Sequence, residues 1–502
     1  MERGDSIHSQ GHENDMSDPL LTEDETVVLE AEHDEVKCSG ALAWEEVKKQ
    51  CWIAGPMVSV NLLQFSLQVM SIMVVGHLGE LALSSASIAT SFANFSGFSV
   101  MIGMGSALET LCGQAYGAKQ YHQLGIHVQR AFFALVCVSI PLAVVWAYMG
   151  NILIVFGQDP LISFEAGQYA RWMIPSLFSY AALQPLVRFL QSQSIGIPMM
   201  LCSAITLCLH VPICWVLVFK SGLGNKGAAL ANSISNWVNV ILLLLYIKIS
   251  PACKRTWISF TSEALHDIKH FLKLAIPSSF MICFQWWSFE ILILLSGLLP
   301  NPKLETSVLS ICLNTNSLAS MIPLGFSAAV STRVSNELGA GRSQAARLAV
   351  YVVFFLSIME AVMIVCLLFS IQNVWGHAYS NDKEVIDYVA SMIPLLAAST
   401  FLDAIQCMIS GTARGCGWQK VGAYVNLGAY YMVGIPVAVL LAFVLHIGGK
   451  GLWVGIICGL CVQNILLFLV TSCTSWEQQA RNARERVHAS SLPIVTDDII
   501  KV

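Results

Sequence analysis

Charged residues are scarce in this chain. Only 12% of its 502 residues are Asp, Glu, Lys or Arg, against about 25% in a typical soluble domain, whereas 55% are hydrophobic. Apolar runs of about 20 residues, the length that crosses a hydrocarbon core of about 30 Å, recur along almost the whole chain. This composition excludes an ordinary soluble domain and predicts a multi-pass membrane protein.

The apolar runs also lack the alternation of apolar and polar residues that is typical of strands in a membrane barrel. Helices and closed barrels are the structures that satisfy their backbone hydrogen bonds in lipid, so we expect helices. The predicted fold is an all-α polytopic membrane protein with twelve transmembrane helices. Their centres lie near residues 64, 98, 139, 180, 210, 238, 287, 318, 358, 400, 433 and 463.

The first 45 residues have no span-length apolar run, and they lack the basic start and short apolar core of a cleaved signal peptide. Scattered Glu and Asp residues predict a disordered acidic tail over residues 1–45. If both termini are cytosolic, 21 of the 27 Lys and Arg residues lie on the cytosolic side and six on the other. This bias is what the positive-inside rule requires.

Pairable cysteines are missing from the loops on the predicted outer side, and most of the 16 cysteines fall within spans. Cys458 and Cys461 form a C-x-x-C inside the twelfth run, without a supporting His or Cys for a metal. No nucleophile with a base and no metal set stands at membrane depth, so an enzyme is not expected. We expect no metal, no organic cofactor and no nucleic-acid partner.

Landmark residues recur at a nearly constant offset. Pro56 and Pro277 are 221 residues apart, and Pro212 and Pro436 are 224 apart. Six spans, an even number, separate the copies, so the two repeats are parallel and related by a pseudo-two-fold axis along the membrane normal. The predicted organisation is the tail 1–45, an N-terminal six-helix lobe 46–247, a cytosolic linker 248–270, a C-terminal six-helix lobe 271–475 and a cytosolic tail 476–502.

Two carboxylates within spans of the second lobe are the strongest candidates for a site. Asp403 belongs to a polar stripe on one face of the tenth span, with Ser399, Gln406 and Ser410 at i, i+4, i+7, i+11 spacing. Glu290 lies near the middle of the seventh span, where a charge costs roughly 2.5 to 3.5 kcal/mol. We interpret both acids as sites for protons and a cationic substrate; hydrogen bonding between helices is the alternative for the stripe.

Neutral and aromatic side chains complete the predicted substrate cavity, although each could instead pack between helices. The tryptophans would suit an organic cation through cation–π contacts. These residues are Asn61, Gln64, Gln68, Asn236, Gln285, Trp286, Trp287, Ser399 and Gln406. Pro56 and Pro277 are the predicted hinges, because proline bends or breaks a helix.

Four other residues carry less weight. Glu109 and Glu337 are expected near the cytosolic ends of their spans, where water can reach them. Glu360 has no polar companion on its own helical face, which favours snorkelling or packing. His210 could carry protons, but a lone histidine is more often a hydrogen-bonded helix contact.

Four segments have the character of family motifs: "ETLCGQAYGAKQY" (109–121), "SGLLPNPKLETSVLSICLN" (296–314), "RVSNELGAG" (333–341) and "SGTARGCGWQKVGAYVNLGAYYMVGIP" (410–436). They resemble the plant branch of the multidrug and toxic compound extrusion (MATE) family, the DETOXIFICATION proteins, over about residues 45–476. The resemblance implies a two-lobe antiporter that expels organic compounds in exchange for protons.

The resemblance also implies roles for particular residues. In eukaryotic relatives an acid in the seventh helix and one in the tenth carry proton coupling, and the tenth-helix acid matches Asp403. The seventh-helix motif usually has Glu before the Trp pair and a second Glu five residues later. Here Gln285 stands at the first position, and only Glu290 remains.

The expected function is therefore proton-coupled export of cationic alkaloids, other secondary metabolites or xenobiotics. Flavonoid glycosides or organic anions are alternative substrates, and a lipid flippase or a channel is less favoured. A buried carboxyl can take a proton from an acidic compartment and release it to the cytosol, and protonation removes the charge that holds a cation. We expect a monomer in the plasma membrane or the vacuolar membrane, driven by the proton gradient.

Overall fold

The computed structural model describes the backbone of residues 23–491 and the side chains of residues 40–489, and in that range the regular structure is helical throughout. Helix α1 (Glu23–Gly76) begins within the segment predicted to be a disordered tail, of which residues 1–22 lie outside the described part. Glu, which is abundant there, favours helix. The chain divides into two units at Glu46, and the account below concerns the unit from Val47 onward.

The N-terminal lobe contains the six predicted spans in order. Its elements after α1 are α2 (Glu80–Ala93), η1 (Asn94–Phe98), α3 (Ser99–Gly117), α4 (Tyr121–Ala147), α5 (Met149–Val155), α6 (Pro160–Ser192), α7 (Ile197–Trp215), η2 (Val216–Lys220) and α8 (Asn225–Ile249). The predicted linker contains two short 3₁₀ turns, η3 (Pro251–Cys253) and η4 (Ser262–Leu265). Helices α2, η1 and α3 form one continuous span, Glu80–Gly117.

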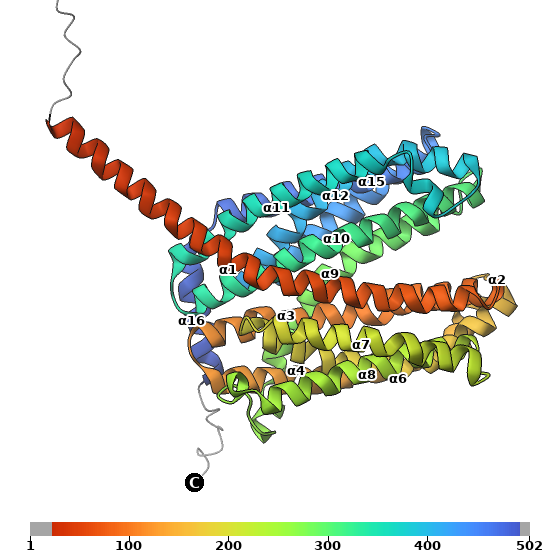
Figure 1. Ribbon diagram of the computed structural model, residues 1–502, viewed down its shortest axis with the longest axis horizontal. Helices are drawn as coiled ribbons and strands as arrows, with labels where there is room; N and C mark the ends of the chain where they lie inside the picture. Colours follow the sequence, from red (N-terminus) through yellow and green to blue (C-terminus); the bar gives the residue numbers. More distant parts are fainter. Residues whose placement is uncertain (1–22, 492–502) are drawn as a thin grey trace, which may run out of the picture. The chain divides into compact units, whose positions relative to one another are not determined.

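The C-terminal lobe repeats this order. It comprises α9 (Ile268–Ser296), α10 (Pro302–Gly339), α11 (Ser343–Ile371), η5 (Trp375–Ala378), α12 (Lys383–Cys416), α13 (Gln419–Asn426), η6 (Leu427–Gly434), α14 (Ile435–Val439), η7 (Leu440–Val444) and α15 (Gly449–Ser472). Elements α13 to η7 form one continuous span, Gln419–Val444. In Figure 1, α10, α11, α12 and α15 run side by side, as do α4, α6, α7 and α8 in the other lobe.

Eleven helices of the described chain are long and apolar enough to cross a membrane, and they coincide with eleven predicted spans. The twelfth, centred near residue 180, corresponds to α6. Its 33 residues extend about 50 Å at 1.5 Å per residue, but they include Glu165, Arg171 and Arg188. Glu165 and Arg188 are half-buried and Arg171 is exposed. Because α6 packs against α2, α3, α4 and α8 within the lobe, the twelve-helix architecture holds.

The predicted hinge prolines do not end their spans. Pro56 lies inside α1 and Pro277 inside α9, and both helices continue through them. Neighbouring helices can satisfy the backbone groups that a proline frees in a membrane helix. The hinge role of both residues remains a prediction.

The C-terminal segment predicted as a tail contains helix α16 (Trp476–Ser491), which packs against α3, α10 and α11. Its buried side is apolar, since Ala480, Ala483 and Val487 are at most 9% exposed. Burial lowers the pKa of the Arg486 guanidinium, which donates to the carbonyl oxygen of Cys416 at 2.8 Å. The described part of this segment is thus an ordered helix that contacts both lobes.

Candidate transport pathway and the contact between the lobes

Asp403 is a buried acid of the C-terminal lobe. It lies on α12, is 4% exposed, and accepts a hydrogen bond from the Ser320 hydroxyl of α10 at 2.6 Å on Oδ2. Gln285 of α9 approaches the other oxygen, Oδ1, with its Nε2 at 3.5 Å. Both contacts are donors to the carboxylate, which is the arrangement that a buried acid requires when it is ionised.

Gln285 and Gln406 form a reciprocal amide pair beside Asp403. Each Nε2 donates to the other's Oε1, at 3.1 and 3.0 Å, and Gln406 also donates to Ser410 at 2.8 Å. One turn beyond Asp403, Ser399 accepts a hydrogen bond from Trp453 of α15 at 3.0 Å. The predicted polar stripe is therefore buried, and it bonds to α9, α10 and α15.

The seventh predicted span carries the other acid and the tryptophan pair. Trp287 donates to the carbonyl oxygen of Phe95 in the N-terminal lobe at 2.9 Å, and the two ring centroids are 4.7 Å apart. Trp286 is 36% exposed, and Glu290 is half-buried. Within residues 40–489, no hydrogen bond connects Glu290 to the Asp403 network. Trp287 thus contacts the opposite lobe, the packing alternative that the sequence left open.

A separate small cavity, with a volume of about 70 Å³, lies in the N-terminal lobe. Three predicted substrate contacts, Gln64, Gln68 and Asn236, line it, whereas Asn61 donates to the carbonyl oxygen of Met321 on α10 at 3.3 Å. The other polar residues of its wall are Thr90, Asn94, Ser176, Tyr180, Ser203, Thr206, Asn232 and Asn239. No Asp, Glu, Lys or Arg belongs to this wall as the structure describes it, so the cavity offers neutral hydrogen-bonding groups.

His210 is connected to this cavity through hydrogen bonds. It is fully buried, with Nε2 2.9 Å from the Ser71 hydroxyl and Nδ1 2.8 Å from the Ser235 hydroxyl. Ser71 donates its single proton to Asn232 Oδ1 at 3.0 Å, so Nε2 of His210 is the donor to Ser71. These bonds favour the helix-contact interpretation, since they hold the Asn232 amide at the cavity wall.

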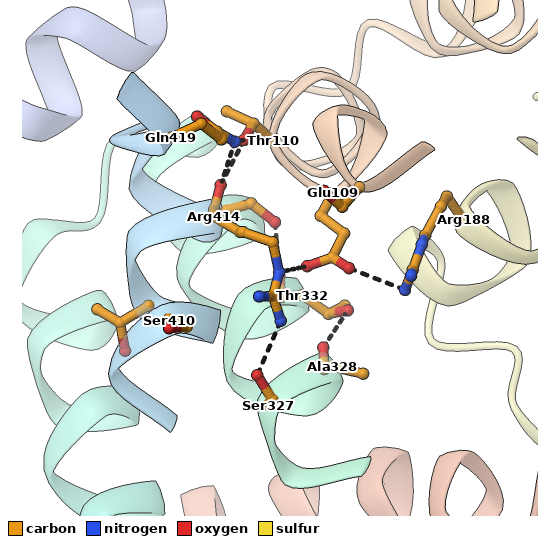
Figure 2. A network of polar contacts seen from close by, with 12 residues as sticks. Glu109, Thr110, Arg188, Ser327, Ala328, Thr332, Ser410, Arg414 and Gln419 are labelled. Carbon is orange, nitrogen blue, oxygen red and sulfur yellow. Dashed lines mark hydrogen bonds and ion pairs between the residues drawn. The ribbon is translucent and has the colours of Figure 1, made fainter. Parts of the chain in front are cut away.

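The two lobes are joined by an ion network centred on Glu109 of α3 (Figure 2). Its carboxylate contacts Arg188 of the same lobe through Oε1 and Arg414 of the other lobe through Oε2, both at 2.8 Å. Arg414 also donates to Ser327 of α10 at 2.8 Å. The expectation that water reaches Glu109 is wrong, because the residue is 4% exposed and covered by both lobes.

Glu337 is buried as well, at 3% exposure, which corrects the same expectation for that residue. It pairs with Arg333 at 2.8 Å and with Arg342 at 2.5 Å. Both arginines are close in sequence, one on the same helix and one in the following turn. Glu337 thus anchors the end of α10, whereas Glu109 connects the lobes.

Close backbone packing surrounds the Glu109 network. A Cβ atom on Gly117 would clash with the Asn336 carbonyl, and one on Gly339 would clash with the Gln114 carbonyl. Asn336 donates to the Ser192 carbonyl at 3.0 Å. The lobes therefore meet where α3 and α10 end, and we call this the basic end because Lys119 and Arg342 follow those helices.

Comparisons with known proteins agree with this architecture. The MatE family model matches residues 56–216 and 277–440, two segments that begin 221 residues apart (277 − 56), the predicted repeat offset. Protein DETOXIFICATION 16 of Arabidopsis thaliana is 59% identical over 447 residues, which cover 89% of this chain and 92% of that protein. Protein DETOXIFICATION 17 of the same plant is 53% identical over 479 residues, which cover 95% of this chain and 98% of that protein.

Solved structures show the same fold. The crystal structure of the eukaryotic MATE transporter AtDTX14 superposes with a TM-score of 0.86 at 52% identity, and the match covers 89% of this chain and all of that one. An outward-facing multidrug resistance MATE family transporter has a TM-score of 0.76 at 16% identity, covering 89% of this chain and 97% of its own. From the repeated family match, these relatives and the two-lobe helical fold, the chain belongs to the MATE family of multidrug and toxic compound efflux transporters.

Proposed function

We propose that this transporter exports organic cations from the cytosol in exchange for protons. Asp403 carries the proposal. It is buried in the middle of a membrane helix, its described contacts are neutral donors, and no Lys, Arg or His in residues 40–489 forms an ion pair with it. A buried carboxylate needs a compensating positive charge, and either a proton or a cationic substrate can supply it.

Exchange follows from competition for that position. When Asp403 faces an acidic compartment, a proton neutralises the carboxyl, and a bound cation loses its attraction and leaves. When it faces the cytosol, the proton dissociates and the restored charge binds the next cation. The same carboxyl thus serves both fluxes in turn, without a complex that holds both ligands.

The contact at the basic end supports alternating access. The Lys and Arg distribution favours a cytosolic location for this end, with both termini on that side. In that orientation the Glu109–Arg414 contact closes the described conformation toward the cytosol. Transport requires the Glu109–Arg414 pair between the lobes to separate and re-form in each cycle. Pro56 and Pro277 are the proposed hinges, with Glu290 a second acid on the pathway.

Neutral glycosides are a second candidate substrate class, favoured by the cavity of the N-terminal lobe. Its wall of amides and hydroxyls can donate to and accept from uncharged oxygen atoms, and it offers no charge to attract a cation. Either substrate would be carried by a monomer in the plasma membrane or the vacuolar membrane, with the proton gradient as the energy source.

The test is Asp403→Asn in purified protein reconstituted into liposomes, with uptake of a fluorescent organic cation driven by an imposed pH gradient. The variant should lose gradient-driven uptake while remaining in the membrane in normal amounts, because the amide cannot exchange a proton. Gln184→Asn, at the matching position of the first repeat, is the control and should retain uptake. Wild-type uptake and pH dependence in Asp403→Asn would refute the proposal.

A further inference from the structure

The residues on its own helical face do not predict the surroundings of Glu360 on α11. The residue is 6% exposed, and both carboxyl oxygens are buried without a hydrogen-bond partner in the described chain. Its neighbours Met359 and Met363 are 58% and 62% exposed and form the outer face of the helix. Snorkelling is therefore excluded, because the side chain lies on the inner face that packs against the lobe.

Asp403 is the buried acid of α12, the helix against which α11 packs most extensively. Counted from the basic end, Glu360 is 17 residues from Ser343 and Asp403 is 13 residues from Cys416, which at 1.5 Å per residue corresponds to about 25 and 20 Å of depth. The two carboxyls lie at nearly the same depth on adjacent, antiparallel helices.

Within residues 40–489, no Lys, Arg or His forms an ion pair with either acid. The helices packed against α11 are α10, α12 and α16. Arg333 of α10 pairs with Glu337 at 2.8 Å, and Arg486 of α16 donates to the Cys416 carbonyl oxygen at 2.8 Å. Arg414 of α12 is bonded to Glu109 and Ser327 at the basic end. Two buried carboxylates without a cation between them cannot both be ionised.

The two acids also differ in their hydrogen bonds. Asp403 accepts a hydrogen bond from Ser320 and faces the Gln285 amide, and these donors stabilise its ionised form. Glu360 has no donor, so its neutral, protonated form is the one that its surroundings tolerate. Different environments assign different roles to neighbouring carboxyls in this way.

We propose that Glu360 is a second proton-binding site of this transporter and forms a carboxyl pair with Asp403. In the described conformation Glu360 holds the proton, while Asp403 is the member that exchanges a proton for a cation. Glu360 in this way keeps the pair at a single negative charge before the substrate binds. This inference rests on the proposed proton coupling and adds to it a residue on a different helix.

The test reads protonation directly. Infrared difference spectra of the purified, reconstituted protein, recorded across a pH titration, report the C=O band of protonated carboxyl groups. Glu360→Gln should remove one titrating band and leave a second, which Asp403→Asn should remove. Ser357→Ala, a buried neighbour on the same face of α11, is the control and should change neither band.

Exchange supplies the second readout. Because the amide of Glu360→Gln reproduces the neutral form that we assign to Glu360, the pH of half-maximal exchange should stay near the wild-type value. Asp403→Asn removes the neighbouring negative charge, so the Glu360 infrared band should titrate at lower pH in that variant. Glu360→Asp, which retains a carboxyl, should restore the infrared band, and it keeps the test decisive if the Gln variant does not insert. Wild-type spectra in Glu360→Gln would overturn the inference.

The two proposals fail in different ways. If wild-type liposomes show no uptake driven by a pH gradient, the proposed function is wrong, whatever Glu360 does. The infrared titration needs neither substrate nor gradient, so it still decides whether Glu360 binds a proton. If the wild type is proton-driven but the infrared titration of Glu360→Gln is indistinguishable from that of the wild type, this inference alone is refuted.

Discussion

Replacing Glu109 with Gln should shift the transporter toward a state that is open at the basic end. The substitution keeps the shape of the side chain and removes the negative charge that two arginines share. The side chains of Arg188 and Arg414 are 15% and 11% exposed when the lobes are joined. In an open state water would hydrate both guanidinium groups, so the loss of Glu109 destabilises mainly the closed state.

The magnitude follows from the burial of the three groups. Removing one partner from a buried ion pair typically costs 3 to 5 kcal/mol. The lower end applies here, because Arg188 keeps its bond to Gln191 Oε1 at 2.6 Å and Arg414 keeps Ser327 at 2.8 Å. About 3 kcal/mol corresponds to a change of roughly 100-fold in the ratio of closed to open molecules, at 1.4 kcal/mol per factor of ten.

Distances between spin labels at the basic end would measure this shift. Labels at Lys119, after α3, and Gln344, at the start of α11, are both exposed and lie on opposite lobes. In Glu109→Gln, the fraction of molecules with a long distance should rise strongly. Arg414→Gln should act in the same direction, and the double variant should change less than the sum of the two, because each single change breaks the same pair.

An unchanged distance distribution in folded Glu109→Gln protein would refute the reasoning. It would mean that the ion network does not distinguish the two states. Glu80→Gln, which removes an exposed acid at the start of α2, is the control for a general effect of charge and should leave the distances unchanged.

Two further predictions concern close contacts of the pathway. Gly117→Val should keep the lobes apart, because its side chain would occupy the position of the Asn336 carbonyl, so the variant should show a long distance between the same labels and no transport. Gly428→Val, at a site with open space, is the control and should transport normally. Normal transport by Gly117→Val would contradict the packing argument. Gln285→Glu places a second carboxyl next to Asp403 Oδ1, now 3.5 Å from the amide, so one of the two should retain its proton to higher pH and the half-maximal pH of exchange should rise. An identical pH profile in that variant would show that residue 285 does not sense Asp403.

The sequence by itself determined the architecture of this protein. Lipid cannot hydrogen-bond the backbone, so span-length apolar runs without strand alternation must be helices, and their number and even spacing set two parallel six-helix lobes. Even the span that is least apolar, α6, was correctly placed by its length and position.

Only the tertiary structure decided which polar groups meet. Glu360 has no polar partner on its own helix, and its relation to Asp403 exists because α11 packs against α12. The sequence places Glu109 near the end of its span, where water could reach it. In the structure the other lobe covers it with Arg414, which is 305 residues away in the sequence. A helical pattern shows which residues share a face but not which helix covers that face, and the energy of a buried charge depends on that neighbour.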